Sequence, residues 1–225
     1  MLGFSPRAIV FDMDGLLLDT ERLTVDAMEM EAAARGLVVR DGLFLSLVGI
    51  DETGSRRLLA EAFGSGFSYE DFRTGYRGRV REQVRTGMPM RPGARAMVEA
   101  AKAAGMPLAV ATSSWLAQAG PHLEQAGVRP LLDALVTRDD VANPKPAPEP
   151  YLLAAARLGV EPAEVLALED SHSGVRSAAA AGMAVVMVPD LLPATGEMRR
   201  LARAVADDLH QVRGWLGLAH ADDFL

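Results

Sequence analysis

The sequence predicts an α/β protein with a Rossmann-like parallel sheet, helices on both faces of the sheet and one inserted helical domain. The run 8–11 is rich in Ile, Val and Phe, which is typical of a strand buried on both faces. From residue 92 onward, helix and strand patterns alternate with short joints, as in repeating βα units. Residues 19–88 carry helical patterns only. We therefore expect an α/β core of residues 1–18 and 89–225 and an all-helical cap domain of residues 19–88.

The helical segment is predicted to hold three helices, at residues 20–35, 52–63 and 69–86. Asp19 or Thr20 can cap the first helix. Two glycines inside the third helical pattern weaken it. The breaker cluster 87–93, with two prolines and two glycines, is expected to be the joint that returns the chain to the core.

The remaining core elements follow in alternation, and a glycine comes directly after most of the predicted helices. Strands are expected at 107–111, 131–136, 165–168 and 184–188, and helices at 94–104, 115–126, 149–158 and 175–181. Such a series predicts one parallel sheet whose functional residues gather at the carboxyl ends of the strands.

The composition excludes several classes of protein. The 225 residues are 49% hydrophobic and 24% charged, as in a soluble globular protein. A net charge of −7 argues against a nucleic-acid polymer as partner, and the absence of cysteine excludes disulfides and thiolate metal sites. No apolar run is long enough to span a membrane, and we expect no signal peptide. A cytoplasmic monomer is therefore expected.

Two carboxylates, Asp12 and Asp14, come directly after the first strand. If both are ionised they repel each other, and a divalent cation bound to their oxygens would relieve that repulsion. The alternative is a solvated Asp-x-Asp-Gly turn, because Asp and Gly are favoured in turns. This motif alone leaves the two interpretations open.

Hydroxyl side chains follow the strand predicted at 107–111. Thr112 and Ser113, with nearby backbone N–H groups, could hold phosphate oxygens. They could equally be caps of the helix that begins near Trp115.

Lys145 lies in a proline-rich segment, 143–150, and is one of two lysines in a chain with 21 arginines. This choice indicates a place for a compact ammonium group rather than a guanidinium. A solvent-exposed lysine in a loop is the alternative.

Glu169 and Asp170 follow a third strand, and residues adjacent in a strand point to opposite sides. They could instead be the acidic N-terminus of the next helix. Taken together, three strands of the predicted sheet end in acid, hydroxyl and acid, and a lysine precedes the third.

These four motifs, in this order, resemble those of the haloacid dehalogenase (HAD) superfamily. The stretch Asp12-Met13-Asp14-Gly15, followed by Asp19-Thr20-Glu21, is similar to the opening motif of that family. The subgroup it resembles contains β-phosphoglucomutase and pseudouridine-5′-phosphatase, whose helical cap is inserted after the first motif.

The resemblance implies a Mg²⁺-dependent phosphatase for a small phosphorylated metabolite, a sugar phosphate or a nucleoside monophosphate. It implies an aspartyl-phosphate on Asp12 and acid–base catalysis by Asp14. The implied phosphate-binding residues are Thr112, Ser113 and Lys145. The implied metal ligands are Asp12, the backbone carbonyl of Asp14, and Asp170. Glu169 is implied as a further residue of the metal site, either as a direct ligand or just outside the direct ligands.

Two alternatives to a phosphatase stay open. A sugar phosphomutase of the same subgroup keeps a histidine and an arginine in its cap, where this chain has Thr24 and Glu52. A second phosphate held in the cap would be repelled by Glu52, so the phosphatase is favoured. A non-catalytic protein of the same fold, which binds a phosphate ligand or a partner, is the second alternative, although every expected catalytic position is filled.

Overall fold

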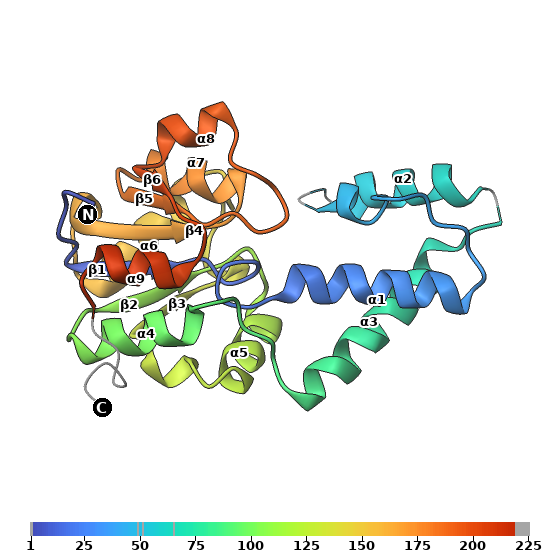
Figure 1. Ribbon diagram of the computed structural model, residues 1–225, viewed down its shortest axis with the longest axis horizontal. Helices are drawn as coiled ribbons and strands as arrows, with labels where there is room; N and C mark the ends of the chain where they lie inside the picture. The colour runs from blue at the N-terminus through green and yellow to red at the C-terminus, as the bar shows by residue number, and fades with distance from the viewer. Residues whose placement is uncertain (1, 49, 51, 65, 219–225) are drawn as a thin grey trace. The chain divides into compact units, whose positions relative to one another are not determined.

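The computed structural model describes residues 2–48, 50, 52–64 and 66–218. It divides into two compact units, one formed by Met1–Asp19 with Pro89–Leu225 and the other by Thr20–Met88 (Figure 1). The first unit holds the sheet, and the second is helical.

The sheet of the first unit has six described strands, all parallel, in the order β3-β2-β1-β4-β5-β6. Their bounds are Ala8–Phe11 for β1, Leu108–Ala111 for β2, Ala134–Val136 for β3, Val165–Glu169 for β4, Ala184–Met187 for β5 and Ala204–Val205 for β6. Strand β1 lies in the middle, with β2 on one side and β4 on the other. The chain adds strands outward in both directions from β1, and ligands of open α/β sheets bind at such a switch point.

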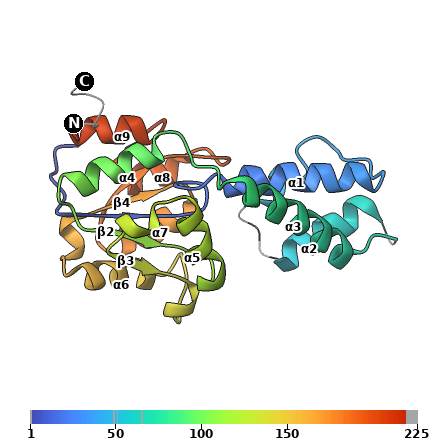
Figure 2. The ribbon, with the colours of Figure 1, turned by 90° about the horizontal axis from the view of Figure 1, so that it is seen from below.

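Helices cover both faces of this sheet (Figure 2). Helices α4 (Ala94–Ala103) and α9 (Leu209–Trp215) pack together on one face, and α6 (Glu149–Leu158) and α7 (His172–Ala180) pack on the other. Helix α5 (Leu116–Gln125) follows β2, and the short helix α8 (Gly196–Leu201) packs against α7. The predicted α/β class with a parallel sheet is confirmed.

Alternate side chains along β1 contribute to the apolar core on one face of the sheet. Ala8 and Val10 of β1 belong to the apolar cluster that also contains Tyr151 and Ala154 of α6 and Val175 of α7. All four residues of β1 are fully buried, as expected for a central strand with a helix layer on each face. This burial holds the carboxyl end of β1 in a fixed place.

Several boundaries differ from the prediction for local reasons. Strand β3 begins at Ala134 because Arg129–Leu131 forms a 3₁₀ turn around a proline. Helix α7 begins at His172 because the Ser171 hydroxyl accepts a hydrogen bond from the Gly174 N–H and caps it. Helices α8 and α9 and strand β6 were not predicted. Further 3₁₀ turns lie at Leu45–Leu47, Arg138–Asp140 and Pro162–Glu164.

The chain leaves the first unit and returns to it through two adjacent segments. The Asp19 N–H donates to the Pro89 carbonyl at 3.0 Å, and the Arg91 N–H donates to the Leu17 carbonyl at 3.0 Å. The Arg91 guanidinium lies 2.9 Å from a carboxylate oxygen of Asp190, whose side chain is fully buried. Backbone pairing and this ion pair therefore fasten the two segments to the α/β unit.

The helical unit consists of α1 (Thr20–Ala34), α2 (Glu52–Phe63) and α3 (Tyr69–Thr86). Helix α1 packs mainly against α3, and an aromatic cluster fills the interior. Its rings belong to Phe44, Phe63, Phe67, Phe72 and Tyr76.

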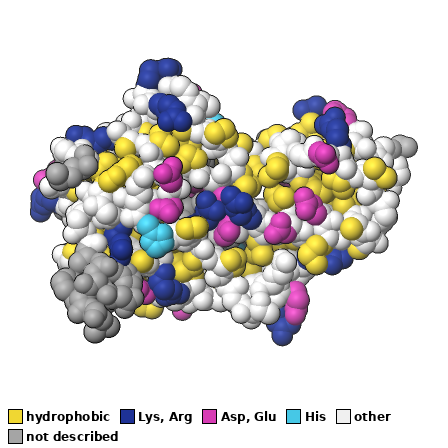
Figure 3. Space-filling view, in the orientation of Figure 1, with side chains coloured by type: hydrophobic (Ala, Val, Ile, Leu, Met, Phe, Trp, Pro, Cys, Tyr) yellow, Lys and Arg dark blue, Asp and Glu magenta, His cyan; other side chains and the backbone are white. Residues whose placement is uncertain are grey.

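Three of the five arginines of α3 contact acidic side chains. Arg73 contacts Glu52 and Glu70, Arg79 contacts Glu31, and Arg85 contacts Glu82. On the face of the molecule seen in Figure 3, basic and acidic side chains are interspersed. Within the described residues, no helix combines the length and the apolar character that a membrane crossing requires.

Candidate active site

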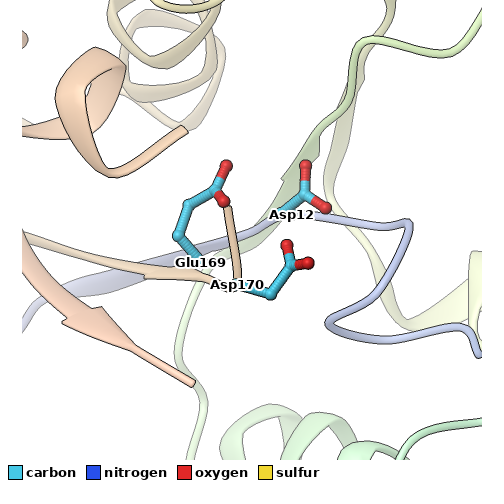
Figure 4. A group of neighbouring side chains, drawn as sticks. All are labelled: Asp12, Glu169 and Asp170. Atoms are coloured by element: carbon cyan, nitrogen blue, oxygen red, sulfur yellow. The ribbon is translucent and has the colours of Figure 1, made fainter. Parts of the chain in front are cut away.

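The site forms where β1 and β4 end side by side. The Asp12 N–H donates to the Leu168 carbonyl at 2.9 Å, so the pairing of the two strands continues one residue beyond β1. This contact brings Asp12 next to Glu169 and Asp170. Oxygens of the three carboxylates lie within 4.8 Å of one another, and all three residues are buried (Figure 4).

Two glycines give these carboxylates their space. Gly15 has a φ of +87°, and a Cβ there would lie 2.3 Å from Oδ2 of Asp170. Gly174, in the first turn of α7, faces Glu169, and a Cβ there would lie 1.6 Å from Oε1. Any larger residue at either position would displace a carboxylate of the cluster.

Lys145 joins the acidic cluster. Its ammonium lies 2.5 Å from Oδ1 of Asp12 and 2.6 Å from Oε1 of Glu169, and only 3% of its side chain is exposed. The alternative of an exposed loop lysine is therefore wrong. The ammonium contacts two of the three clustered carboxylates, so with all three ionised the buried cluster carries an excess of negative charge, which favours a bound cation.

Burial and mutual contact shift the pKa values of Asp12 and Lys145. Burial raises the pKa of Asp12 well above its ordinary value, the Lys145 ammonium opposes that rise, and Glu169 and Asp14 add to it. Burial alone would lower the pKa of Lys145, but the carboxylates of Asp12 and Glu169 raise it above its ordinary value. The contacts with these two carboxylates therefore favour the protonated form of Lys145.

Asp14 lies beside the hydroxyl groups that follow β2. The Ser114 hydroxyl donates to Oδ2 of Asp14 at 2.7 Å, and the Thr112 hydroxyl lies 3.4 Å from the same oxygen. Sequence reasoning missed Ser114, although a third consecutive hydroxyl residue could have drawn attention to it. The Asp14 side chain is not part of the three-carboxylate group.

The cap interpretation of Thr112 and Ser113 does not describe the start of α5. Trp115 is the N-cap residue and its side chain makes no capping hydrogen bond, while Oδ2 of Asp139 accepts from the Leu116 N–H. The Thr112 hydroxyl accepts from the Ser114 N–H at 3.0 Å. Ser113 is exposed and makes no side-chain hydrogen bond within the described part of the chain.

The predicted residues thus come together with two differences. Asp12, Lys145, Glu169 and Asp170 form one buried cluster, and Asp14 and Thr112 are in contact at its edge. Ser113 is not drawn into these contacts, and Tyr151, which no motif indicated, contacts Glu169. The fold and these residues define an α/β protein whose parallel sheet carries acids, hydroxyls and one buried lysine at its carboxyl edge, where an anion can be held beside a cation.

Comparisons with known proteins agree with this class. Residues 6–182 match the haloacid dehalogenase-like hydrolase family. The phosphorylated carbohydrates phosphatase of Thermotoga maritima is 35% identical over 177 residues, which cover 79% of this chain and 82% of that protein. The chain therefore belongs to the haloacid dehalogenase-like hydrolases.

Two further relatives extend the comparison. A Drosophila melanogaster protein named "Probable pseudouridine-5'-phosphatase" is 36% identical over 189 residues, 80% of each chain. A crystal structure of a HAD family hydrolase from Deinococcus radiodurans, with bound phosphate and sodium, superposes with a TM-score of 0.81 at 27% identity. It covers 94% of this chain and 95% of that one.

Proposed function

We propose that this protein is a Mg²⁺-dependent phosphatase that hydrolyses a small phosphate monoester through an aspartyl-phosphate on Asp12. The substrate class is a sugar phosphate or a nucleoside monophosphate. The observation that carries the proposal is the buried group of Asp12, Glu169 and Asp170 with the Lys145 ammonium bound between two of them. Relatives named as phosphatases for phosphorylated carbohydrates and pseudouridine-5′-phosphate support the reaction class.

The acidic cluster suits a hard divalent cation. Its donors are carboxylate oxygens, the ligand type that Mg²⁺ prefers, and the space beside Asp170 exists only because Gly15 has no side chain. Asp12, Asp170 and the backbone carbonyl of Asp14 would hold the ion, with Glu169 nearby. When bound, Mg²⁺ would offset the charge of the phosphate and of the nucleophile.

The chain's own residues account for the steps. Asp12 attacks phosphorus, and Lys145 offsets the negative charge that gathers on Asp12 and the phosphate. Asp14 gives a proton to the leaving oxygen and later takes one from the attacking water. Thr112 and Ser113 donate hydrogen bonds to the phosphate oxygens. The contact between Ser114 and Asp14 holds the acid toward one side of the site.

Two observations in the helical unit favour hydrolysis over a phosphomutase reaction. The Thr24 hydroxyl donates to the Thr20 carbonyl of its own helix, and Glu52 is paired with Arg73 and Arg56. Neither residue supplies the free cationic group that would hold a second phosphate. The phosphomutase is thus the second candidate, and the non-catalytic protein of the same fold is the third.

We further propose that the helical unit acts as the cap of this enzyme and excludes bulk water during the reaction. The paired segments around Asp19 and Pro89 support an inserted domain, because both ends of the insertion lie together. A monomeric state and a cytoplasmic location stay predictions from the sequence, and light scattering tests the first.

A phosphate-release screen tests the proposed function. The purified protein is incubated with Mg²⁺ and a panel of sugar phosphates, polyol phosphates and nucleoside monophosphates, and inorganic phosphate is measured. We expect release from at least one ester, with none from the Asp12→Asn variant. A panel without any turnover by the wild-type protein contradicts the proposal and favours the non-catalytic alternative.

A further inference from the structure

The Glu169 carboxylate is held by four hydrogen bonds, two on each oxygen. Oε1 accepts from the Lys145 ammonium at 2.6 Å and from the Tyr151 hydroxyl at 2.8 Å. Oε2 accepts from the N–H and the hydroxyl of Ser171, each at 3.0 Å. An ionised carboxylate offers about four lone-pair sites, so these donors occupy all of them. Glu169 therefore serves as a fixed anchor.

Tyr151 is the unexpected member of this arrangement. It lies in the first turn of α6, it is fully buried, and its ring belongs to the apolar cluster beneath the sheet. A carboxylate oxygen accepts hydrogen bonds, so the Tyr151 hydroxyl is the donor in its 2.8 Å contact with Oε1 of Glu169.

Tyr151 also contacts the lysine. The Lys145 ammonium lies 5.0 Å from the centre of the Tyr151 ring and 3.4 Å from its hydroxyl oxygen. An ammonium near the face of an aromatic ring is attracted to it. The three protons of Lys145 thus face Asp12, Glu169 and Tyr151, and two of these three partners are bonded to each other.

We propose that Tyr151 is a positioning residue whose hydroxyl fixes Glu169 and, through it, holds the Lys145 ammonium against Asp12. A phenylalanine would fill the same apolar space, so packing alone gives no reason for the hydroxyl. Without it, the Glu169 carboxylate keeps one partner fewer on Oε1 and can turn, and the ammonium follows. The inference rests on the proposed function for its kinetic consequence, but the geometry of Lys145 can be measured separately.

The kinetic test is Tyr151→Phe, which removes one oxygen and keeps the ring. We expect kcat for phosphate release to fall about 10- to 100-fold, the range for a lost hydrogen bond to a charged group. KM should stay within about 3-fold because Thr112 and Ser113 are untouched. The matched control is Tyr76→Phe, which removes the hydroxyl of another buried tyrosine, in the aromatic cluster of the helical unit, and should leave kcat unchanged. Equal kcat in wild type and Tyr151→Phe overturns the proposal.

The second test does not need catalysis. The chain has two lysines, so protein labelled with ¹⁵N-lysine gives two side-chain ammonium signals, which a Lys102→Arg variant assigns. Lys102 is 37% exposed and serves as the internal reference. We expect the Lys145 ammonium protons to exchange slowly with water in the wild-type protein and at least about 10-fold faster in Tyr151→Phe, with Lys102 unchanged. Unchanged exchange at Lys145 overturns the inference, whereas a wild-type protein without phosphatase activity contradicts only the proposed function.

Discussion

Charged residues that lie close together in this site differ in how many partners they have. Glu169 is saturated with donors, whereas Asp12 shares the Lys145 ammonium and lies beside Asp170. A saturated carboxylate is a poor nucleophile because its lone pairs are occupied. Of Glu169 and Asp12, Asp12 is therefore the better candidate for attack on phosphorus.

Asparagine substitutions separate the roles proposed for the two aspartates. Asp12→Asn keeps the shape and removes the nucleophilic charge, so turnover should vanish while the fold is kept. Asp14→Asn should lower kcat about 10²- to 10⁴-fold, the usual contribution of a general acid–base group. The loss should be smallest with an aryl phosphate, whose leaving group needs little protonation. Steady-state kinetics check both; near-normal activity in Asp12→Asn would mean that the nucleophile is another residue.

Gly174 offers a test of how tightly Glu169 is confined. In Gly174→Ala the new methyl group would lie within 2.2 Å of all three atoms of the Glu169 carboxyl group, so that group must move and take Lys145 with it. We expect kcat to fall at least about 10-fold, as for a lost hydrogen bond to a charged group. The matched control is Gly214→Ala in α9, where a Cβ meets nothing within 4 Å and helix propensity improves stability by up to about 1 kcal/mol. Equal activity of the two variants would show that the carboxylate has room to yield.

Among the secondary-structure elements, α1 and α3 are joined by one buried acid as well as by apolar packing. Glu31 on α1 accepts from Arg35 of its own helix segment at 2.6 Å and from Arg79 of α3 at 2.8 Å. Its side chain is 9% exposed, while both arginines remain partly in water. Glu31 is thus a buried polar link between the two helices.

The pH dependence of stability should report on Glu31. Burial alone would raise its pKa, but the hydrogen bonds from Arg79 and Arg35 lower it below the ordinary value. A lowered pKa adds stability above about pH 4.3, the ordinary value, and that gain is lost as the pH falls through the folded-state pKa. Glu31→Gln should lower the free energy of unfolding by roughly 1–3 kcal/mol at pH 7.

Urea unfolding at several pH values checks this expectation. The difference between wild type and Glu31→Gln should shrink as the pH is lowered below about 4. A difference that stays constant from pH 7 to pH 3 would mean that the charge of Glu31 contributes nothing to the helix interface.

The elements differed in how well the sequence predicted them. Strands β1, β2 and β4 were predicted because full burial on both faces leaves continuous apolar runs. Strand β6 is only two residues long, both half-buried, and α8 is only six residues long. Neither is long enough to show a periodic pattern of apolar residues. Tyr151 was missed for another reason: its ring follows the apolar pattern of α6, and only the three-dimensional structure reveals what its hydroxyl contacts.

The sequence predicted those features of the site that follow from parallel strand pairing. Because β2, β1 and β4 are neighbours, the residues that follow them had to meet at one edge. Which hydroxyl contacts Asp14 depends on the turn after β2, and pattern alone did not distinguish Ser113 from Ser114. The chemical roles of these residues remain predictions until the variants are measured.

For the whole molecule, Mg²⁺ should act on stability as well as on activity. A cation that binds only the folded protein adds about 2.7 kcal/mol at a concentration 100 times its Kd. We expect Mg²⁺ to raise Tm, EDTA to abolish phosphate release, and added Mg²⁺ to restore it. In Asp170→Asn the rise in Tm should be reduced. Full turnover in EDTA would exclude a metal-dependent reaction.

The choice between phosphatase and phosphomutase is also a property of the whole enzyme. With β-glucose 1-phosphate we expect either no reaction or release of inorganic phosphate, because Glu52 and Thr24 offer no site for a second phosphate. ³¹P NMR distinguishes the products directly. Accumulation of glucose 6-phosphate without free phosphate, stimulated by the bisphosphate, would assign this chain to the phosphomutases.

The paired segments at Asp19 and Pro89 have a consequence for how such proteins can diversify. Because the two ends of the helical unit are hydrogen-bonded neighbours, its whole length from Thr20 to Met88 is an insertion that need not strain the sheet. We expect that replacing it with a different folded module, or with a short turn, would leave the order of β1 to β6 and the acidic cluster intact. We therefore propose that recombination could exchange the helical unit as a whole, and with it the substrate range, while the reacting groups of the α/β unit are inherited unchanged.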